Sequence, residues 1–250
     1  MTAAEKTSLA RFLDAAGASA RGGYGPKPPT YDFTDDAEIS AEIPVELPTA
    51  EPAEDDLESI ARELETCAAC RLAQGRKRAV PGEGAESPLV LVIGEGPGAE
   101  EDASGRPFVG PAGRLLDKML AAIGLSREEN CFIANIVKCR PPGNRDPMDD
   151  ETAACLPFLH RQIALLRPAF ILCMGRIAAG IVLRSGESLG RLRGRITELD
   201  IAGLRIPALA TYHPSAILRN DEYRRPAWED LKLLKSALDS GCPLDSEKEA

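Results

Sequence analysis

Four of the seven cysteines are spaced as metal ligands. Cys67 and Cys70 form a C-x2-C pair, Cys139 follows an apolar segment, and Cys155 lies on the next expected helix. Four thiolates complete a tetrahedral S4 site, which suits either zinc or a 4Fe-4S cluster. Composition alone favours zinc, and unlinked buried thiols are the plainer alternative. A metal here would tie the N-terminal part of the domain to the loop after the second strand.

A glycine-rich turn with acidic residues follows the first expected strand. The segment GEGPG at 94–98 is followed by Glu100, Glu101 and Asp102. Glycine lets the backbone approach a ligand closely, but three acids would repel a pyrophosphate, which disfavours a dinucleotide site. The acids can instead accept N–H donors of a nucleobase or polarise a water. Capping of the next helix is the plainer explanation.

Three further side chains have the chemistry needed to bind a planar base. Phe108 is a loop aromatic in a chain with only 4% aromatic residues, and stacking on a flipped base needs such a ring. Asn135 presents a donor and an acceptor together, which matches the O4 and N3–H edge of uracil. His213 can donate a hydrogen bond to a developing anion. Their plainer roles are a core plug, a backbone-bonded amide and a strand-end cap.

The segment AILRN after His213 pairs apolar side chains with an arginine, and we expect it at a loop tip. This combination suits a wedge that enters a duplex where a base leaves it. Leu218 and Arg219 would form the wedge, with Arg219 near a phosphate.

Charge is distributed unevenly along the chain. The net charge is −9, but residues 1–66 hold 15 acidic and 5 basic residues, so the remainder has a net charge of +1. Basic residues gather within that remainder at 71–78, 191–195 and 219–225. A near-neutral core presents a basic face to nucleic acid where its arginines cluster. One such cluster alone is more often a solvated face.

The apolar pattern predicts an α/β fold with a parallel sheet covered on both faces. Strands are expected at 89–94, 131–137, 169–174 and 205–211, and helices at 112–123, 149–166, after 175 and at 226–238. A helical stripe at 57–64 leads into the first cysteine pair. Ligand sites in such folds lie at the carboxyl ends of the strands, where most of the motifs fall.

Both ends of the chain are expected to lie outside the folded domain at 55–240. Residues 1–54 are rich in Ala, Pro, Asp and Glu, which predicts an acidic disordered tail free to bind a partner, and 241–250 form a polar tail. The sequence holds no apolar run of about 18 residues that would span a membrane. The N-terminus also lacks a secretion signal. We therefore expect a cytoplasmic monomer.

Five motifs together resemble those of the family 4 uracil-DNA glycosylases. They are C-x2-C-R-L, GEGPG-x-E-E-D, GRPFVGPAG, N-I-V-K-C-R-P-P-x-N-R and HPSAILRN, in order between Cys67 and Leu238. The resemblance implies a three-layer α/β/α sandwich on a four-stranded parallel sheet. It also implies a 4Fe-4S cluster on the four cysteines and the release of uracil from deoxyuridine in single- or double-stranded DNA.

Carried over by position, the resemblance places three residues of the glycine-rich turn and its helix in a uracil pocket. Glu95 and Gly96 would line the pocket, and Glu101 would lie near the base edge that excludes a thymine methyl group. The family lacks the water-activating Asp of family 1 glycosylases, and this chain has Gly96 at that place. Catalysis is therefore expected to depend on stabilising the departing uracil anion.

The remaining roles fall on the three base-binding candidates. Phe108 would stack on the base, Asn135 would read its Watson–Crick edge, and His213 would face O2. The expected catalytic residues are then His213, Glu95 and Asn135.

Two other functions fit the same residues. One is a binding module that holds uracil in DNA without cleaving it, and the other is a zinc-stabilised nucleotide-binding protein. An assay for strand nicking after alkali separates a glycosylase from a binder. Colour separates a brown iron–sulfur protein from a colourless zinc protein.

Overall fold

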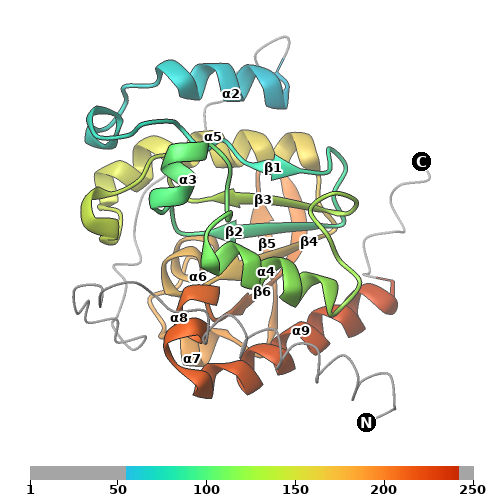
Figure 1. Cartoon of the computed structure of the whole chain (residues 1–250). Coiled ribbons are helices and arrows are strands. Elements are labelled where there is room, and N and C mark those ends of the chain that lie inside the picture. The colour runs from blue at the N-terminus through green and yellow to red at the C-terminus, as the bar shows by residue number, and fades with distance from the viewer. Residues whose placement is uncertain (1–54, 242–250) are drawn as a thin grey trace, which may run out of the picture.

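Six strands form one sheet in the computed structural model, which describes residues 55–241 (Figure 1). The strand order is β1-β3-β2-β4-β6-β5. The four inner strands are parallel, and the edge strands β1 and β5 run antiparallel to their neighbours. The expected four-stranded parallel sheet is therefore present, with one further strand at each edge. The expected tail at 1–54 and residues 242–250 lie outside the described residues.

The inner strands are the apolar runs of the sequence. β2 (Val90–Gly94), β3 (Cys131–Asn135) and β4 (Phe170–Met174) are buried along their whole length, and β6 (Leu204–Thr211) is buried from Ile206 onward. Parallel strands covered on both faces need apolar side chains on both sides. For this reason the inner strands can be recognised in the sequence as continuous hydrophobic runs.

The edge strands carry a weaker sequence signal. β1 (Glu83–Gly84) has two half-buried residues, and β5 (Ile196–Ile201) is mostly exposed or half-buried and forms a hairpin with β6. Neither segment contains a continuous apolar run. The count of four strands was therefore too low by these two.

Helices cover both faces of the sheet. One core cluster joins one set of strand side chains to α5 (Asp149–Leu166), α6 (Arg176–Val182) and α7 (Leu189–Leu192). The other joins the opposite set to α4 (Pro111–Ala121), α8 (Pro214–Arg219) and α9 (Arg224–Asp239). Successive residues of a strand point to opposite faces, so neighbours in β2 belong to different clusters. The predicted three-layer α/β/α architecture is confirmed.

The first helix is attached to the sandwich by an ion-pair network. α2 (Leu57–Thr66) lies along α5 (Figure 1). The Arg161 guanidinium on α5 donates to the carboxylates of Asp55 and Glu63, each at 2.6 Å at its closest. The shorter elements are α3 (Ala99–Ser104), η1 (Arg71–Gln74), η2 (Pro142–Asn144) and η3 (Asp221–Tyr223). Among residues 55–241, no helix has the length and apolar character needed to cross a membrane.

Candidate active site

The carboxyl ends of the inner strands bring three predicted side chains to one edge of the sheet, on the left of Figure 1. Glu95 follows β2, Asn135 ends β3, and His213 comes two residues after β6. Gly94 lies opposite Asn135 in the β2–β3 register. This is the edge at which open α/β sheets bind ligands.

Asn135 and Phe108 pack against the same glycine. A Cβ on Gly94 would lie 2.4 Å from Oδ1 of Asn135 and 2.6 Å from Cζ of Phe108, so only glycine fits there. Asn135 is 1% exposed, and its Oδ1 has no hydrogen-bond partner within residues 55–241. Leaving a buried acceptor unpaired costs about 1–3 kcal/mol. Such an atom at a strand end is ready to receive a donor from a ligand.

The Phe108 ring lies next to the His213 ring. Their centroids are 5.4 Å apart, and their planes are inclined at 33°. Gly175 allows this arrangement, because a Cβ there would lie 2.9 Å from Cβ of His213. Gly175 also has a φ of 89°, which disfavours other residues. Phe108, from the loop before α4, thus lies beside His213 and packs against the same glycine as Asn135.

His213 has a defined hydrogen-bonding state. Its Nδ1 accepts the backbone N–H of Ser215 at 3.1 Å and lies 2.8 Å from the Ser215 hydroxyl. Burial, with a smaller effect of the nearby Arg219 charge, lowers the pKa of His213 to about 4. The ring is therefore neutral near pH 7, with its proton on Nε2. His213 can act as a neutral hydrogen-bond donor at this edge.

Glu95 is half-buried and electrostatically unusual. Burial, together with the charge of Asp146, raises the pKa of its carboxyl group to about 7 against the opposing charges of Arg176 and Arg219. Arg176 also donates to Asp146 at 2.5 Å. A carboxyl group that titrates near neutrality at the ligand-binding edge of a sheet is a candidate for catalysis.

The four predicted cysteine ligands come from three parts of the fold. Cys67 follows α2, Cys70 precedes η1, Cys139 lies beyond β3, and Cys155 is on α5. All four are free thiols. Burial raises the pKa of Cys139 most strongly, Arg76 lowers it, and Cys70 and Cys67 raise it through their charges, which means that these thiols are neighbours. Cys155 is likewise influenced by Cys139 and Cys70.

Two sulfurs of this set already receive hydrogen bonds. Arg76 donates to Cys139 Sγ at 3.3 Å, and the backbone N–H of Lys138 donates to Cys155 Sγ at 3.2 Å. Such donors stabilise thiolates and tune clusters. Within residues 55–241, no three His, Cys, Asp or Glu side chains are arranged to hold a metal ion.

Comparison with known proteins identifies the family. The sequence profile described as the uracil DNA glycosylase superfamily matches residues 81–232, which include the glycine-rich turn, Phe108, Asn135 and His213. The chain belongs to the uracil-DNA glycosylase superfamily. Its relatives point to one branch within it. A type-4 uracil-DNA glycosylase of Saccharolobus solfataricus is 46% identical, over 74% of this chain and 88% of that protein. A second from Thermotoga maritima is 40% identical, over 73% of this chain and 95% of that protein.

The type-5 branch of the uracil-DNA glycosylases is less similar. A type-5 enzyme of Pyrobaculum aerophilum is 32% identical, over 66% of this chain and 78% of that protein. The expected resemblance to family 4 is therefore confirmed.

Glu101 of this glycosylase-family chain accepts hydrogen bonds from backbone N–H groups. Its Oε1 accepts the N–H groups of Val109 and Gly110 at 2.8 and 2.9 Å, and its Oε2 accepts that of Gly98 at 3.1 Å. The carboxylate thus joins the glycine-rich turn to the loop that carries Phe108. The structure shows Glu101 as an organiser of the loop; its expected place at the edge of the base is not visible in these contacts.

Gly96 is fixed by close packing from the cysteine loop. A Cβ on Gly96 would lie 2.8 Å from Cγ2 of Val137 and 3.6 Å from Cδ of Pro141. Any larger residue would collide with Val137. The backbone of the expected pocket therefore depends on the chain that leads into and beyond Cys139.

The expected loop tip at AILRN is a helix, which corrects the sequence-based expectation. α8 begins at Pro214 and ends at Arg219, and Leu218 is buried in the core cluster that contains α4 and α9. Proline at the first helical position and the capping His213 side chain explain why the helix starts here. Leu218 cannot enter a duplex without leaving the core, whereas Arg219 is exposed.

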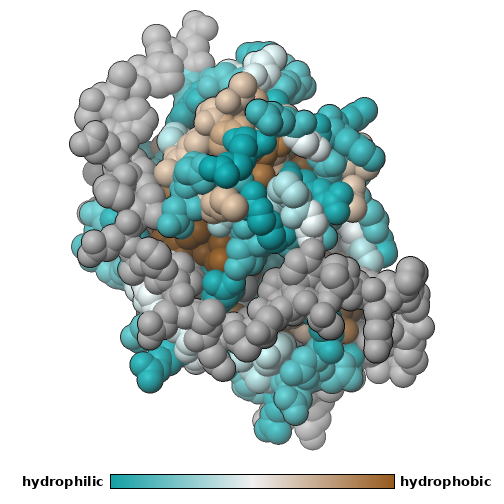
Figure 2. All heavy atoms as spheres, turned by 90° about the vertical axis from the view of Figure 1, so that its left-hand side faces the viewer, coloured by the Kyte–Doolittle hydropathy of each residue, from teal (hydrophilic) through white to brown (hydrophobic). Residues whose placement is uncertain are grey.

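The basic clusters are partly neutralised in the folded protein. Arg71, Arg193 and Arg195 form ion pairs with Asp150, Asp230 and Glu187, at 2.6, 2.8 and 2.6 Å. Figure 2 views the edge that carries the strand ends and shows hydrophilic side chains around a smaller apolar area. The basic surface offered to DNA is therefore smaller than the sequence count suggests.

Three residues that support the site were not predicted. Ser215 orients His213, Asp146 raises the pKa of Glu95, and Arg127 donates to the carbonyls of the Phe108 loop. The HPS triplet could have suggested Ser215, because proline and serine commonly begin a helix. No local pattern indicates Arg127 or Asp146, because each acts on residues distant in the sequence.

Proposed function

We propose that this protein excises uracil from DNA by hydrolysing the N-glycosidic bond of deoxyuridine, which leaves an abasic site and begins base excision repair. The observation that carries the proposal is the buried Oδ1 of Asn135, which has no hydrogen-bond partner among residues 55–241. Uracil N3–H is a donor suited to that oxygen, and the amide N–H of Asn135 can donate to uracil O4. Cytosine has no N3 proton and offers a donor in place of O4. A site of this kind rejects mispaired analogues strongly.

The base must leave the helix before it can reach Asn135, which lies inside the protein. Flipping costs a few kcal/mol of unstacking and unpairing. Stacking on Phe108 recovers part of this cost, since base–aromatic stacking contributes about 1–3 kcal/mol. The exposed Arg219 is proposed to contact a DNA phosphate near the flipped nucleotide. Leu218 is packed in the core and would have to leave it to serve as the proposed wedge.

Bond breaking is proposed to depend on His213. As the C1′–N1 bond cleaves, the electrons move to uracil, negative charge develops on O2, and the sugar becomes an oxocarbenium ion. The neutral His213 ring with its proton on Nε2 can donate to O2 in a site that excludes most water. Removing one such donor typically costs about 2.7–4 kcal/mol of barrier stabilisation.

Glu95 is proposed to act on the other half of the transition state. Its carboxylate, once ionised, would stabilise the positive sugar and guide the water that attacks C1′. The pKa of about 7 means that both protonation states are populated at neutral pH. Gly96 is proposed to line the pocket through its backbone. Glu101 is proposed to restrict the 5-position of the base indirectly, by holding the Phe108 loop in place.

The four cysteines are proposed to bind a 4Fe-4S cluster. The four free thiols, the hydrogen bonds to two of their sulfurs and the similarity to type-4 uracil-DNA glycosylases support this proposal. The bound cluster would supply a structural link between α2, the loop after β3 and α5. Residues 55–240 are proposed as the catalytic domain of a monomeric enzyme.

Alkali treatment of a uracil-containing duplex tests the proposed activity. The purified protein should convert a labelled strand with one deoxyuridine into an alkali-labile strand and release free uracil. An identical duplex with thymidine is the control. Retention of the duplex without any alkali-labile product would favour the alternative of a uracil-binding module.

A further inference from the structure

The backbone of Phe108 is held in an unfavourable conformation. Its φ is 52°, in the left-handed region that a bulky residue rarely adopts. The residue is also 6% exposed and part of a core cluster. Strain of this kind persists only where surrounding groups over-determine the conformation. The contacts of the loop show which groups do so.

Two charged side chains hold the Phe108 loop, one by its backbone carbonyls and the other by its backbone N–H groups. Arg127 donates to the carbonyls of Pro107 and Phe108, both at 2.9 Å. Glu101 accepts the next two backbone N–H groups, as described above. A cation on the carbonyls and an anion on the amides both stabilise this one arrangement of the loop, because hydrogen bonds to charged groups are stronger than neutral ones.

Arg127 is itself fixed in place. It is 7% exposed, and its Nε and Nη2 atoms donate to Oδ1 of Asp117 on α4 at 3.0 and 2.7 Å. Its Nη1 lies 3.7 Å from Glu83 of β1. The planar guanidinium therefore connects the loop to α4 and to the edge of the sheet. Lysine could not reproduce this fork of donors.

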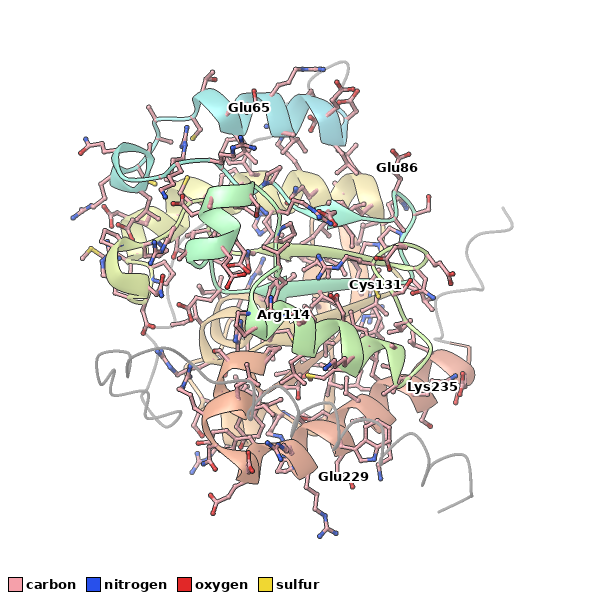
Figure 3. The ribbon with its side chains drawn as sticks, in the orientation of Figure 1. Glu65, Glu86, Arg114, Cys131, Glu229 and Lys235 are labelled. Atoms are coloured by element: carbon pink, nitrogen blue, oxygen red, sulfur yellow. The ribbon has the colours of Figure 1, made fainter. Side chains whose placement is uncertain are left out.

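An exposed arginine that bonds to the same loop provides a contrast. Arg114, on the first turn of α4 (Figure 3), donates to the Val109 carbonyl at 3.1 Å. Its side chain is 58% exposed, so water can replace its hydrogen bond. The carbonyls bound by Arg127 are buried. They would lose their donors if Arg127 were removed.

We infer that Arg127 is a positioning residue that holds Phe108 in the orientation needed to stack on the flipped base. The inference rests on the proposed stacking role of Phe108. It assigns the strength of uracil binding to a residue outside the pocket, and Arg127 need not touch the base. Loss of Arg127 should free the loop to relax, so that the ring no longer lies beside His213.

The test compares a duplex that presents an uncleavable uracil nucleotide with a duplex that has no base at the same position. One carries 2′-fluoro-deoxyuridine, which resists cleavage, and the other carries a tetrahydrofuran abasic site. Arg127→Met should weaken binding of the first by about 5-fold to 100-fold, the range of base–aromatic stacking. Binding of the second should change less than about two-fold, since no base is present to stack. Arg205→Met, at an exposed arginine on β6, is the matched control and should change neither.

A double variant separates positioning from general damage. In a Phe108→Leu background, Arg127→Met should cause little further loss for the uracil duplex, because the ring on which it acts is gone. An equal loss in both backgrounds, or an equal loss for both duplexes, would overturn the inference. If Arg127→Met does not fold, Asp117→Asn and Arg127→Lys are the variants to test. Each should weaken binding of the uracil duplex, by less than Arg127→Met would, and leave binding of the abasic duplex unchanged. Unchanged binding of the uracil duplex by both variants would also overturn the inference. Failure of the wild-type protein to release uracil would instead reject the proposed function.

Discussion

Nδ1 of His213 accepts the backbone N–H of Ser215 at 3.1 Å, and this bond decides which ring nitrogen can donate to a substrate. A neutral imidazole has one N–H, and here it must lie on Nε2. The low pKa of about 4 keeps the ring neutral through the physiological range. The histidine can therefore stabilise an anion without supplying a full positive charge.

Replacing His213 should affect the transition state more than the ground state. His213→Ala should lower the single-turnover rate of uracil excision by roughly 10²–10³, while binding to uracil DNA stays nearly unchanged. Both constants should be measured on the same duplex, with excision followed at saturating enzyme. Excision at the wild-type rate would remove His213 from the mechanism, and weaker binding alone would make it a docking residue.

Glu95 should give the reaction a pH dependence near neutrality. Its raised pKa of about 7 predicts that the excision rate increases as pH rises through 7, when the carboxylate that stabilises the sugar cation forms. Glu95→Gln should be slower above pH 7, and the inflection should disappear. A wild-type profile that is flat between pH 6 and about pH 8 would contradict this role.

The same carboxyl group should destabilise the fold at high pH. A carboxyl with a raised folded-state pKa binds its proton more tightly when folded, so the free energy of unfolding falls as pH rises from the usual value of 4.5 towards about 7. Glu95→Gln should then raise the melting temperature at pH 8 more than at pH 4. Thermal unfolding at the two pH values checks the sign, with Glu198→Gln as an exposed control.

Asn135 should determine the choice of base. In Asn135→Asp the ionised side chain has no N–H for uracil O4, so uracil excision should fall sharply. The new acceptor suits the amino group of cytosine, and slow cytosine excision should appear. Product analysis on matched duplexes with deoxyuridine or deoxycytidine checks both effects. Uracil excision that is unaffected would show that Asn135 does not read the base.

The cysteines should yield a brown protein when it is purified without oxygen. About four irons and four sulfides per chain are expected for one 4Fe-4S centre. Cys139→Ser should lower the iron content and the yield of soluble protein. Cys131→Ser changes a buried thiol outside the proposed ligand set and should keep the iron. Stoichiometric zinc without acid-labile sulfide would reject the cluster.

The start of the catalytic domain should depend on an ion pair of Asp55 and on the helix cap that Asp56 provides. A chain beginning at Asp55 keeps the carboxylate that Arg161 binds and the Asp56 cap of α2. It should retain its cluster and full excision activity. A chain beginning at Leu57 loses both contacts and should melt at a lower temperature. Loss of activity in the longer of the two would place part of residues 1–54 in the catalytic domain.

The sequence by itself determined the four inner strands of the sheet, the order of the motifs and the candidate ligands. Strand cores such as β2 and β4 are apolar along their whole length, and this property can be read from adjacent residues. The same holds for the C-x2-C pair and the glycine-rich turn. Helix α8 was missed at HPSAILRN, although its proline and cap are local signals.

Only the tertiary structure decided how the site residues are held and which of them are free to act. It left Oδ1 of Asn135 unpaired, buried Leu218 in the core, and engaged Glu101 with backbone amides. It also placed Arg127 on the Phe108 carbonyl, 19 residues away in the sequence. Burial and hydrogen-bond partners depend on which distant segments pack together, and no spacing along the chain records that.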